Sequence, residues 1–129
     1  TAPIIPQLTD KDMEAILEAA AANGAVCAGW TMLRLPFEVK TLFRDWVAQH
    51  YPLRAGHVMS IVQQVRGGRD NDPEFGSRMR GQGQFADLIA RRFDIAARRL
   101  GLNRERPPMD TSRFKPPVSA AQRAQLPLF

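Results

Sequence analysis

The chain has 129 residues, of which 44% are hydrophobic and 24% are charged, and its formal net charge at pH 7 is +5. This length and composition are typical of one soluble globular domain and leave little room for a second. No apolar run approaches the roughly 18 residues that span a bilayer, and the single cysteine, Cys27, excludes a disulfide framework. A reducing, cytoplasmic setting is therefore expected.

Charge is unevenly distributed along the chain. Residues 1–53 contain four basic and six acidic residues, whereas residues 54–129 contain fourteen basic and seven acidic ones, and thirteen of those fourteen bases are arginine. Arginine presents a planar fork of donors that fits phosphate better than the point charge of lysine does. The second half is therefore expected to meet a polyanion, the alternative being a generic basic surface.

The beginning of the chain predicts an α/β arrangement. Residues 2–6 are a short apolar run closed by proline, which is typical of a buried strand end. Thr9 or Asp10 can cap a helix that stops at Gly24, and the apolar run 25–35 then predicts a second strand. Strand, helix and strand in this order imply a parallel pair with a right-handed crossover.

Two features suggest a piece of a longer protein. The chain begins at Thr1 without an initiator methionine, although removal of that methionine would leave the same end. Two parallel strands also make a poor sheet by themselves, because parallel sheets need cover on both faces. The truncated sheet would leave an open strand edge, through which a homo-oligomer is expected to form.

From Pro36 the pattern changes to that of helices. Apolar residues recur at helical spacing in three segments, 36–51, 54–66 and 85–100, and these amphipathic helices are expected to bury a common seam as a small bundle. The end of the chain is rich in proline and has little periodicity, which is typical of an extended tail. The predicted organisation is an α/β piece, an all-α extension and a tail, at residues 1–35, 36–102 and 103–129.

The second and third predicted helices are joined by a loop, residues 66–83, with five glycines and four arginines. Glycine at this density allows the backbone to approach a ligand closely. A loop of this length inside a compact domain is usually functional or disordered. Three interpretations remain open: a self-paired solvated loop, an anion or nucleic-acid contact, and an inter-domain hinge. The candidate anion ligands are Arg66, Arg69, Arg78 and Arg80.

No self-contained active site is apparent in the sequence. His50 and His57 are seven residues apart with Pro52 between them, which is not the spacing of two metal ligands on one helix. A Ser-His-Asp order, a P-loop and a dinucleotide fingerprint are also missing. The acidic residues of the loop are expected to pair with neighbouring arginines rather than to bind calcium; they are Asp70, Asp72 and Glu74.

Several runs in combination resemble one protein family. They are Ala2-Pro3-Ile4-Ile5-Pro6-x-Leu8-Thr9-Asp10, Leu33-Arg34-Leu35-Pro36-x-Glu38-Val39, Arg66-Gly67-Gly68-Arg69-Asp70, Arg78-Met79-Arg80-Gly81 and Asp110-Thr111-Ser112-Arg113-Phe114. Together they resemble the carboxy-terminal part of the radical S-adenosylmethionine proteins related to spore photoproduct lyase, often described as DNA repair photolyase-like. The resemblance covers most of the chain.

The resemblance implies a lyase-like parent enzyme with a partial TIM-type barrel. In that family a C-x-x-x-C-x-x-C loop holds a 4Fe–4S cluster that cleaves S-adenosylmethionine to a radical, and this sequence lacks the motif. Residues 1–35 would be the end of the barrel, with Ile5 and Pro6 near the S-adenosylmethionine pocket. No catalytic residue can be carried over, so the implied role of the chain is to bind the substrate, DNA or another nucleic acid, or a partner.

The last five residues suggest a different role. Gln125-Leu126-Pro127-Leu128-Phe129 resembles the short peptide by which bacterial DNA polymerases and repair proteins dock on the sliding clamp. Leu126, Leu128 and Phe129 would enter an apolar groove, and Gln125 would supply a side-chain hydrogen bond. The chain would then be an interaction module. Two alternatives remain: the apolar end folds back on the helices, or the whole extension only closes the barrel.

Overall fold

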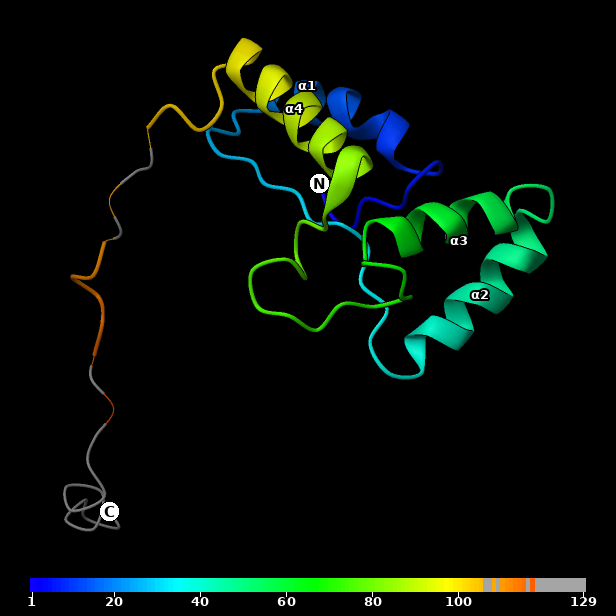
Figure 1. Cartoon of the computed structure of the whole chain (residues 1–129). Helices are drawn as coiled ribbons and strands as arrows, with labels where there is room; N and C mark the ends of the chain where they lie inside the picture. The colour runs from blue at the N-terminus through cyan, green and yellow to red at the C-terminus, as the bar shows by residue number, and fades with distance from the viewer. Residues whose placement is uncertain (106–107, 109, 116, 118–129) are drawn as a thin grey trace, which may run out of the picture.

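The computed structural model describes residues 1–105, 108, 110–115 and 117. The regular structure of this part consists of a short 3-10 helix, η1, and four α-helices arranged as two pairs, with α1 against α4 and α2 against α3 (Figure 1). None of the described helices combines the length and apolar character that a bilayer-spanning segment requires. The bounds are Asp10–Asp12 for η1, Met13–Ala22 for α1, Val39–His50 for α2, Ala55–Gln64 for α3 and Gly83–Arg99 for α4.

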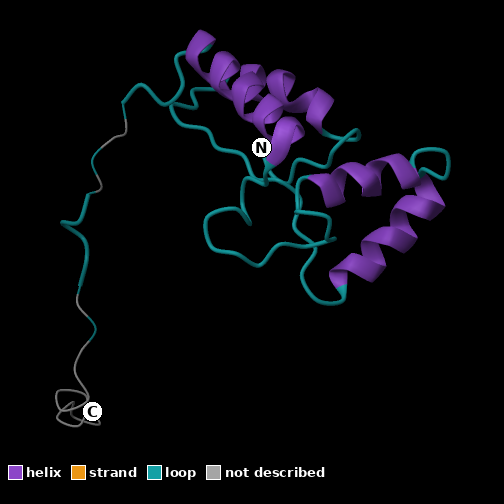
Figure 2. Ribbon diagram, in the orientation of Figure 1, coloured by secondary structure: helices purple, strands orange, loops and turns teal. Residues whose placement is uncertain are grey.

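The predicted α/β arrangement is wrong, because the described residues form helices and loops but no strand (Figure 2). The helix expected after Asp10 is present as η1 and α1. The segments on either side of it share one isolated parallel bridge, between Ile4 and Met32. There, Ile4 N donates to Thr31 O (2.8 Å) and Leu33 N donates to Ile4 O (2.9 Å). This single contact does not extend into a sheet or a barrel.

The second apolar run fails to form a strand because its backbone finds other partners. Met32 N donates to Met79 O in the loop before α4 (2.9 Å), and Leu35 N donates to Asn71 Oδ1 (3.2 Å). From Trp30 onward the apolar side chains of the run are buried against helices, whereas Val26 is 60% exposed. A buried extended segment and a buried strand both have a continuous apolar sequence, so hydrophobic periodicity does not distinguish them. The strand edge expected to support a homo-oligomer is therefore absent from the described residues.

α1 and α4 lie side by side although α2 and α3 separate them in the sequence (Figure 1). Leu17 of α1 and Ile89 and Phe93 of α4 are buried in the core of this pair. They recur at helical spacing, so each helix presents one apolar stripe to the other. The buried ring of Trp30 packs beside Phe93, with ring centroids 6.5 Å apart. Trp30 therefore belongs to this core.

Ion pairs reinforce the contact between α1 and α4. The Arg92 guanidinium donates to both carboxylate oxygens of Glu14 (2.8 and 2.7 Å) and to Asp10 O (2.8 Å). The hydrogen bonds from Arg92 are the main cause that holds the pKa of Glu14 below its ordinary value. Arg99 pairs with Glu18, one turn further along α1 and two turns further along α4. Two arginines of the basic half are thus engaged by acids of the first half.

α2 and α3 form the second pair, so the predicted three-helix bundle is also wrong. Val47 of α2 and Val58 and Val62 of α3 are buried between these two helices. Ile61 and the C-cap residue Val65 instead join the core shared by α1 and α4. α3 therefore connects the two pairs, and the apolar stripe of α4 is covered by α1.

Part of the apolar stripe of α2 faces solvent where a bundle partner was expected. Leu42 is 63% exposed, and Trp46 is also exposed. Trp46 stacks against Phe43 and His50 of the same helix, with ring centroids 5.8 and 5.2 Å apart. Contacts within α2 thus replace part of the cover that a third helix would have given.

Candidate functional site

The loop of residues 66–83 connects α3 with α4 (Figure 1). Arg66 fastens the start of this loop. The Arg66 residue is only 1% exposed. Its Nη1 atom donates to Arg78 O (2.8 Å), and its Nη2 atom donates to Met32 O (3.2 Å) and to Leu33 O. One guanidinium thus joins the far side of the loop to the extended segment that precedes α2. The loop is held against the core and is not a purely solvated segment.

Burial is the main cause that lowers the pKa of Arg66, and the nearby Asp72 opposes this shift. Asp72 is itself buried: its carboxylate accepts hydrogen bonds from the Ser77 hydroxyl and from Glu74 N (2.9 Å). These bonds, led by that of Ser77, lower the pKa of Asp72, with smaller contributions from Arg66 and Arg69. Asp72 therefore shapes the turn and balances the charge of Arg66 inside the protein.

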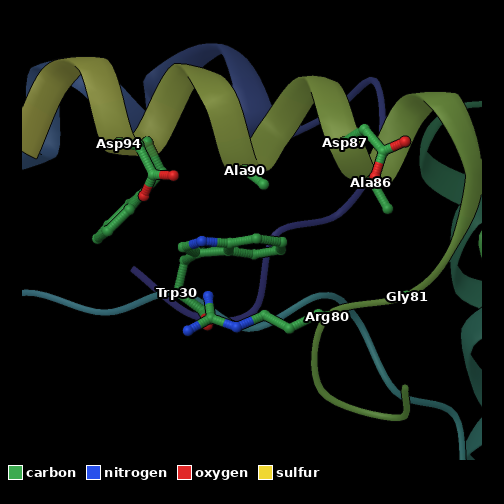
Figure 3. A pocket seen from close by; sticks show the side chains of 8 residues that line it. Trp30, Arg80, Gly81, Ala86, Asp87, Ala90 and Asp94 are labelled. Atoms are coloured by element: carbon green, nitrogen blue, oxygen red, sulfur yellow. The ribbon is translucent and has the colours of Figure 1, made fainter. Parts of the chain in front are cut away.

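Arg80 fastens the other end of the loop. Figure 3 shows the Arg80 guanidinium along one face of the Trp30 indole, with α4 beyond the opposite face. The guanidinium carbon lies 4.5 Å from the ring centroid, and Arg80 Nη1 donates to Trp30 O (3.0 Å). A cation–π contact together with a hydrogen bond fixes this side chain. Arg80 thus anchors the loop to the core of α1 and α4.

The hollow around Trp30 and Arg80 has a volume of about 300 Å³. Asp87 and Asp94 of α4 also line it and lie on either side of Ala90 (Figure 3). Two carboxylates against one guanidinium give a net negative lining. This hollow therefore does not favour an anionic ligand.

The guanidinium groups of Arg69 and Arg78 make fewer contacts than those of Arg66 and Arg80. Arg69 is exposed and makes no hydrogen bond or ion pair among the described residues. Arg78 is half-buried, and its guanidinium carbon lies 4.8 Å from the centroid of the exposed Phe75 ring. The four predicted anion ligands are therefore not brought to one point: Arg66 and Arg80 fix the loop, and Arg69 and Arg78 remain available on it.

A second hollow, of about 460 Å³, lies between the segment before α2 and the loop. Arg69 is the one predicted ligand in its wall. Sequence patterns missed its other cation, Lys40, and its exposed ring, Phe37, which is 84% exposed although it was assigned to an inward stripe. The full lining is Leu35, Phe37, Lys40, Arg69, Asp70 and Asn71.

The negative charge of Asp70, which lines this hollow, is balanced by an ion pair with Arg44. Arg44 donates to both of its carboxylate oxygens (2.8 and 2.7 Å), and Gln63 Nε2 donates to Oδ1 (2.9 Å). The hydrogen bond from Arg44 is the largest cause that lowers the pKa of Asp70, and the charge of Lys40 acts in the same direction. Lys40 and Arg69 are therefore not cancelled by this carboxylate.

The remaining predicted site residues lie apart from both hollows. Pro6 is fully buried, and Ile5 is half-buried against the core of α2 and α3. Ile5 O accepts hydrogen bonds from Leu8 N (3.1 Å) and Thr9 N (3.0 Å), so Ile5 and Pro6 begin a tight turn before η1. The residues predicted to bind a sliding clamp lie outside the described part of the chain; they are Gln125, Leu126, Leu128 and Phe129.

The described residues do not provide a site for an iron–sulfur cluster. Cys27 is a single exposed thiol. Within the described ranges no group of three or more His, Cys, Asp and Glu side chains could hold a metal ion. A scan against protein-family models, a search of curated proteins and a search of solved structures each found no match to this chain.

Proposed function

We propose that the chain is the carboxy-terminal segment of a radical S-adenosylmethionine enzyme that acts on DNA or another nucleic acid, and that the segment contributes phosphate contacts. The five sequence runs listed above support the parentage. The sequence has one cysteine and cannot supply a three-cysteine ligand set, so no step of the radical reaction is assigned to it. The parent protein would supply the cluster, and a reducing, cytoplasmic setting belongs to the same proposal.

The observation that carries the binding role is the way the loop is fastened. Arg66 and Arg80 hold its two ends, and Arg69 and Arg78 are left with guanidinium groups that make no hydrogen bond to described backbone or carboxylate groups. A backbone that is already ordered loses little entropy when its side chains bind a ligand. Guanidinium groups on such a support suit phosphate oxygens, which they contact without regard to base sequence.

Nucleic-acid binding with a steep salt dependence is the expected result. Each phosphate contact contributes roughly 0.7 to 0.9 to the slope of log K against log salt concentration, so Arg69→Ala with Arg78→Ala should reduce that slope by about 1.5. Fluorescence anisotropy of labelled single- and double-stranded oligonucleotides between about 50 and 200 mM salt measures it. Arg54→Ala with Arg113→Ala is the matched control, because it removes the same two charges from exposed positions outside the loop.

Two outcomes would contradict the phosphate contacts. The first is that the unmodified chain binds neither oligonucleotide at the lowest salt concentration. The second is that the double variant and the matched double control have the same slope, since the binding would then reflect net charge alone.

A second candidate is docking on the bacterial DNA sliding clamp, which the final five residues favour. Deletion of residues 125–129 should abolish binding of the chain to purified clamp, measured by surface plasmon resonance, without changing the far-UV circular dichroism spectrum. Gln122→Ala, just before the motif, should bind as the unmodified chain does. Equal binding by the deleted and the unmodified chain would exclude this role.

A further inference from the structure

We propose that the hollow between the segment before α2 and the loop binds a single nucleotide unit, with its phosphate against Lys40 and Arg69 and its base against Phe37. This inference rests on the proposed function and deepens it, because it names a site and a ligand class. The shared chemistry is a phosphate attached to an aromatic ring system, whether it belongs to a free nucleotide or to one unit of a strand.

The size and position of the hollow fit such a ligand. Its volume of about 460 Å³ exceeds that of the hollow at Trp30 and lies in the range of small-molecule sites, roughly 300 to 1,000 Å³. Its walls come from two stretches that are distant in sequence. One contains Leu35, Phe37 and Lys40, and the other contains Arg69 and Asn71.

The charges of the lining favour an anion. Asp70 is the one acid that lines the hollow among the described residues, and Arg44 already occupies both of its oxygens. The side chains of Lys40 and Arg69 are exposed, and neither makes an ion pair or a hydrogen bond with any residue that the structure describes. Two cations beside a neutralised carboxylate leave a net positive site, which attracts phosphate.

Phe37 gives the site its preference for an aromatic group. The residue is 84% exposed, and its backbone has φ +48°, in the left-handed region that bulky side chains rarely adopt. Such a conformation persists only where the surrounding structure imposes it, and strained residues of this kind cluster at active sites, ligand clamps and switch regions. An exposed ring beside two cations offers a face on which a base can stack.

Asn71 positions the two walls relative to each other. Its Oδ1 atom accepts a hydrogen bond from Leu35 N (3.2 Å), two residues before Phe37. This bond uses the acceptor of the amide and leaves its two N–H donors for the hollow that Asn71 lines. Both walls are thus fixed before a ligand arrives, and Asn71 adds a donor suited to a phosphate or base oxygen.

The test is isothermal titration calorimetry of the full chain with three probes: thymidine monophosphate, inorganic phosphate and thymidine. The monophosphate should bind about tenfold more tightly than phosphate, since base–aromatic stacking contributes that much, and thymidine should bind most weakly. Lys40→Ala should weaken monophosphate binding about tenfold. Phe37→Ala should remove the advantage of the monophosphate over phosphate and leave phosphate binding unchanged.

The controls are exposed residues of the same types. Lys11→Ala on η1 and Phe75→Ala at the loop tip, where the phenyl group is 90% exposed, should leave monophosphate binding within about twofold of the unmodified chain. The proposal is overturned if the monophosphate binds no more tightly than phosphate, or if Lys40→Ala and Phe37→Ala behave as these controls do.

The two proposals can fail separately. If oligonucleotides bind with the expected salt slope but the monophosphate does not bind, the hollow is not the nucleotide site and the phosphate contacts of the loop stand. If the monophosphate binds and depends on Phe37 while no oligonucleotide binds at low salt, the hollow takes a free nucleotide and the proposed nucleic-acid function is wrong.

Discussion

Replacing Arg66 with methionine is expected to lower the free energy of unfolding by about 3 to 5 kcal/mol. Methionine fills most of the space but donates no hydrogen bond, so the carbonyl groups of Met32, Leu33 and Arg78 would be buried without their donors. Each such group costs roughly 1 to 3 kcal/mol. Equilibrium denaturation in urea, followed by circular dichroism, measures the loss.

Two further variants test the explanation. Arg66→Lys should recover only part of the loss, because one ammonium group cannot span carbonyls on two segments as a guanidinium does. Arg69→Met, three residues away and exposed, should change the unfolding free energy by less than about 0.5 kcal/mol. If Arg66→Met is as stable as Arg69→Met, the loop is not fastened to residues 32 and 33 in solution.

Gly81→Ala is expected to have the second largest effect, a loss of about 2 to 4 kcal/mol in unfolding free energy. Gly81 has φ +78°, which costs an L-residue roughly 1 to 2 kcal/mol. An added Cβ would also lie 3.1 Å from Val65 O and 3.2 Å from Val65 Cβ, and overpacking of this kind typically costs 1 to 3 kcal/mol. Val65 O accepts a hydrogen bond from Gln82 N (3.0 Å), which the displacement would weaken.

Gly83 provides a control for the backbone contribution. Its φ is +82°, close to that of Gly81, but no heavy atom lies within 4 Å of a Cβ added there. Gly83→Ala should therefore lose only the conformational part, about 1 to 2 kcal/mol, in the same denaturation experiment. Equal losses for the two variants would show that the contact with Val65 does not contribute.

The sequence predicted the helices well because each is long and periodic. The segments 36–51, 54–66 and 85–100 correspond to α2, α3 and α4 within a few residues, and the helix after Asp10 corresponds to α1. Their partners could not be predicted. The stripe on α4 has the same pattern whether it meets α1 or α2, and only tertiary packing decides between them.

The predicted strands failed for a related reason. The apolar run 25–35 satisfies burial equally well as a strand or as an extended segment under helices. Two of its backbone partners, Met79 and Asn71, lie more than thirty residues further along the chain. No local pattern indicates such contacts.

The candidate site was predicted in part. Glycine and arginine density identified the loop, and Arg69 lies in the wall of the proposed nucleotide site. Spacing does not reveal that Arg66 is buried or that Arg80 lies on Trp30, because both facts depend on residues about 30 to 50 positions away. Phe37 was assigned to the apolar stripe of a helix predicted to begin at residue 36, whereas α2 begins at Val39 and leaves Phe37 outside the helical spacing.

The pairing of α1 with α4 has a consequence for the order of folding. Glu14 and Arg92 are separated by 78 positions, whereas α2 and α3 are neighbours joined by a short turn. Contacts between sequence neighbours close small loops at little entropic cost, and distant ones form more slowly. We therefore expect the α2–α3 hairpin to form first. The pairing of α1 with α4 is expected to form later, together with the burial of Arg66.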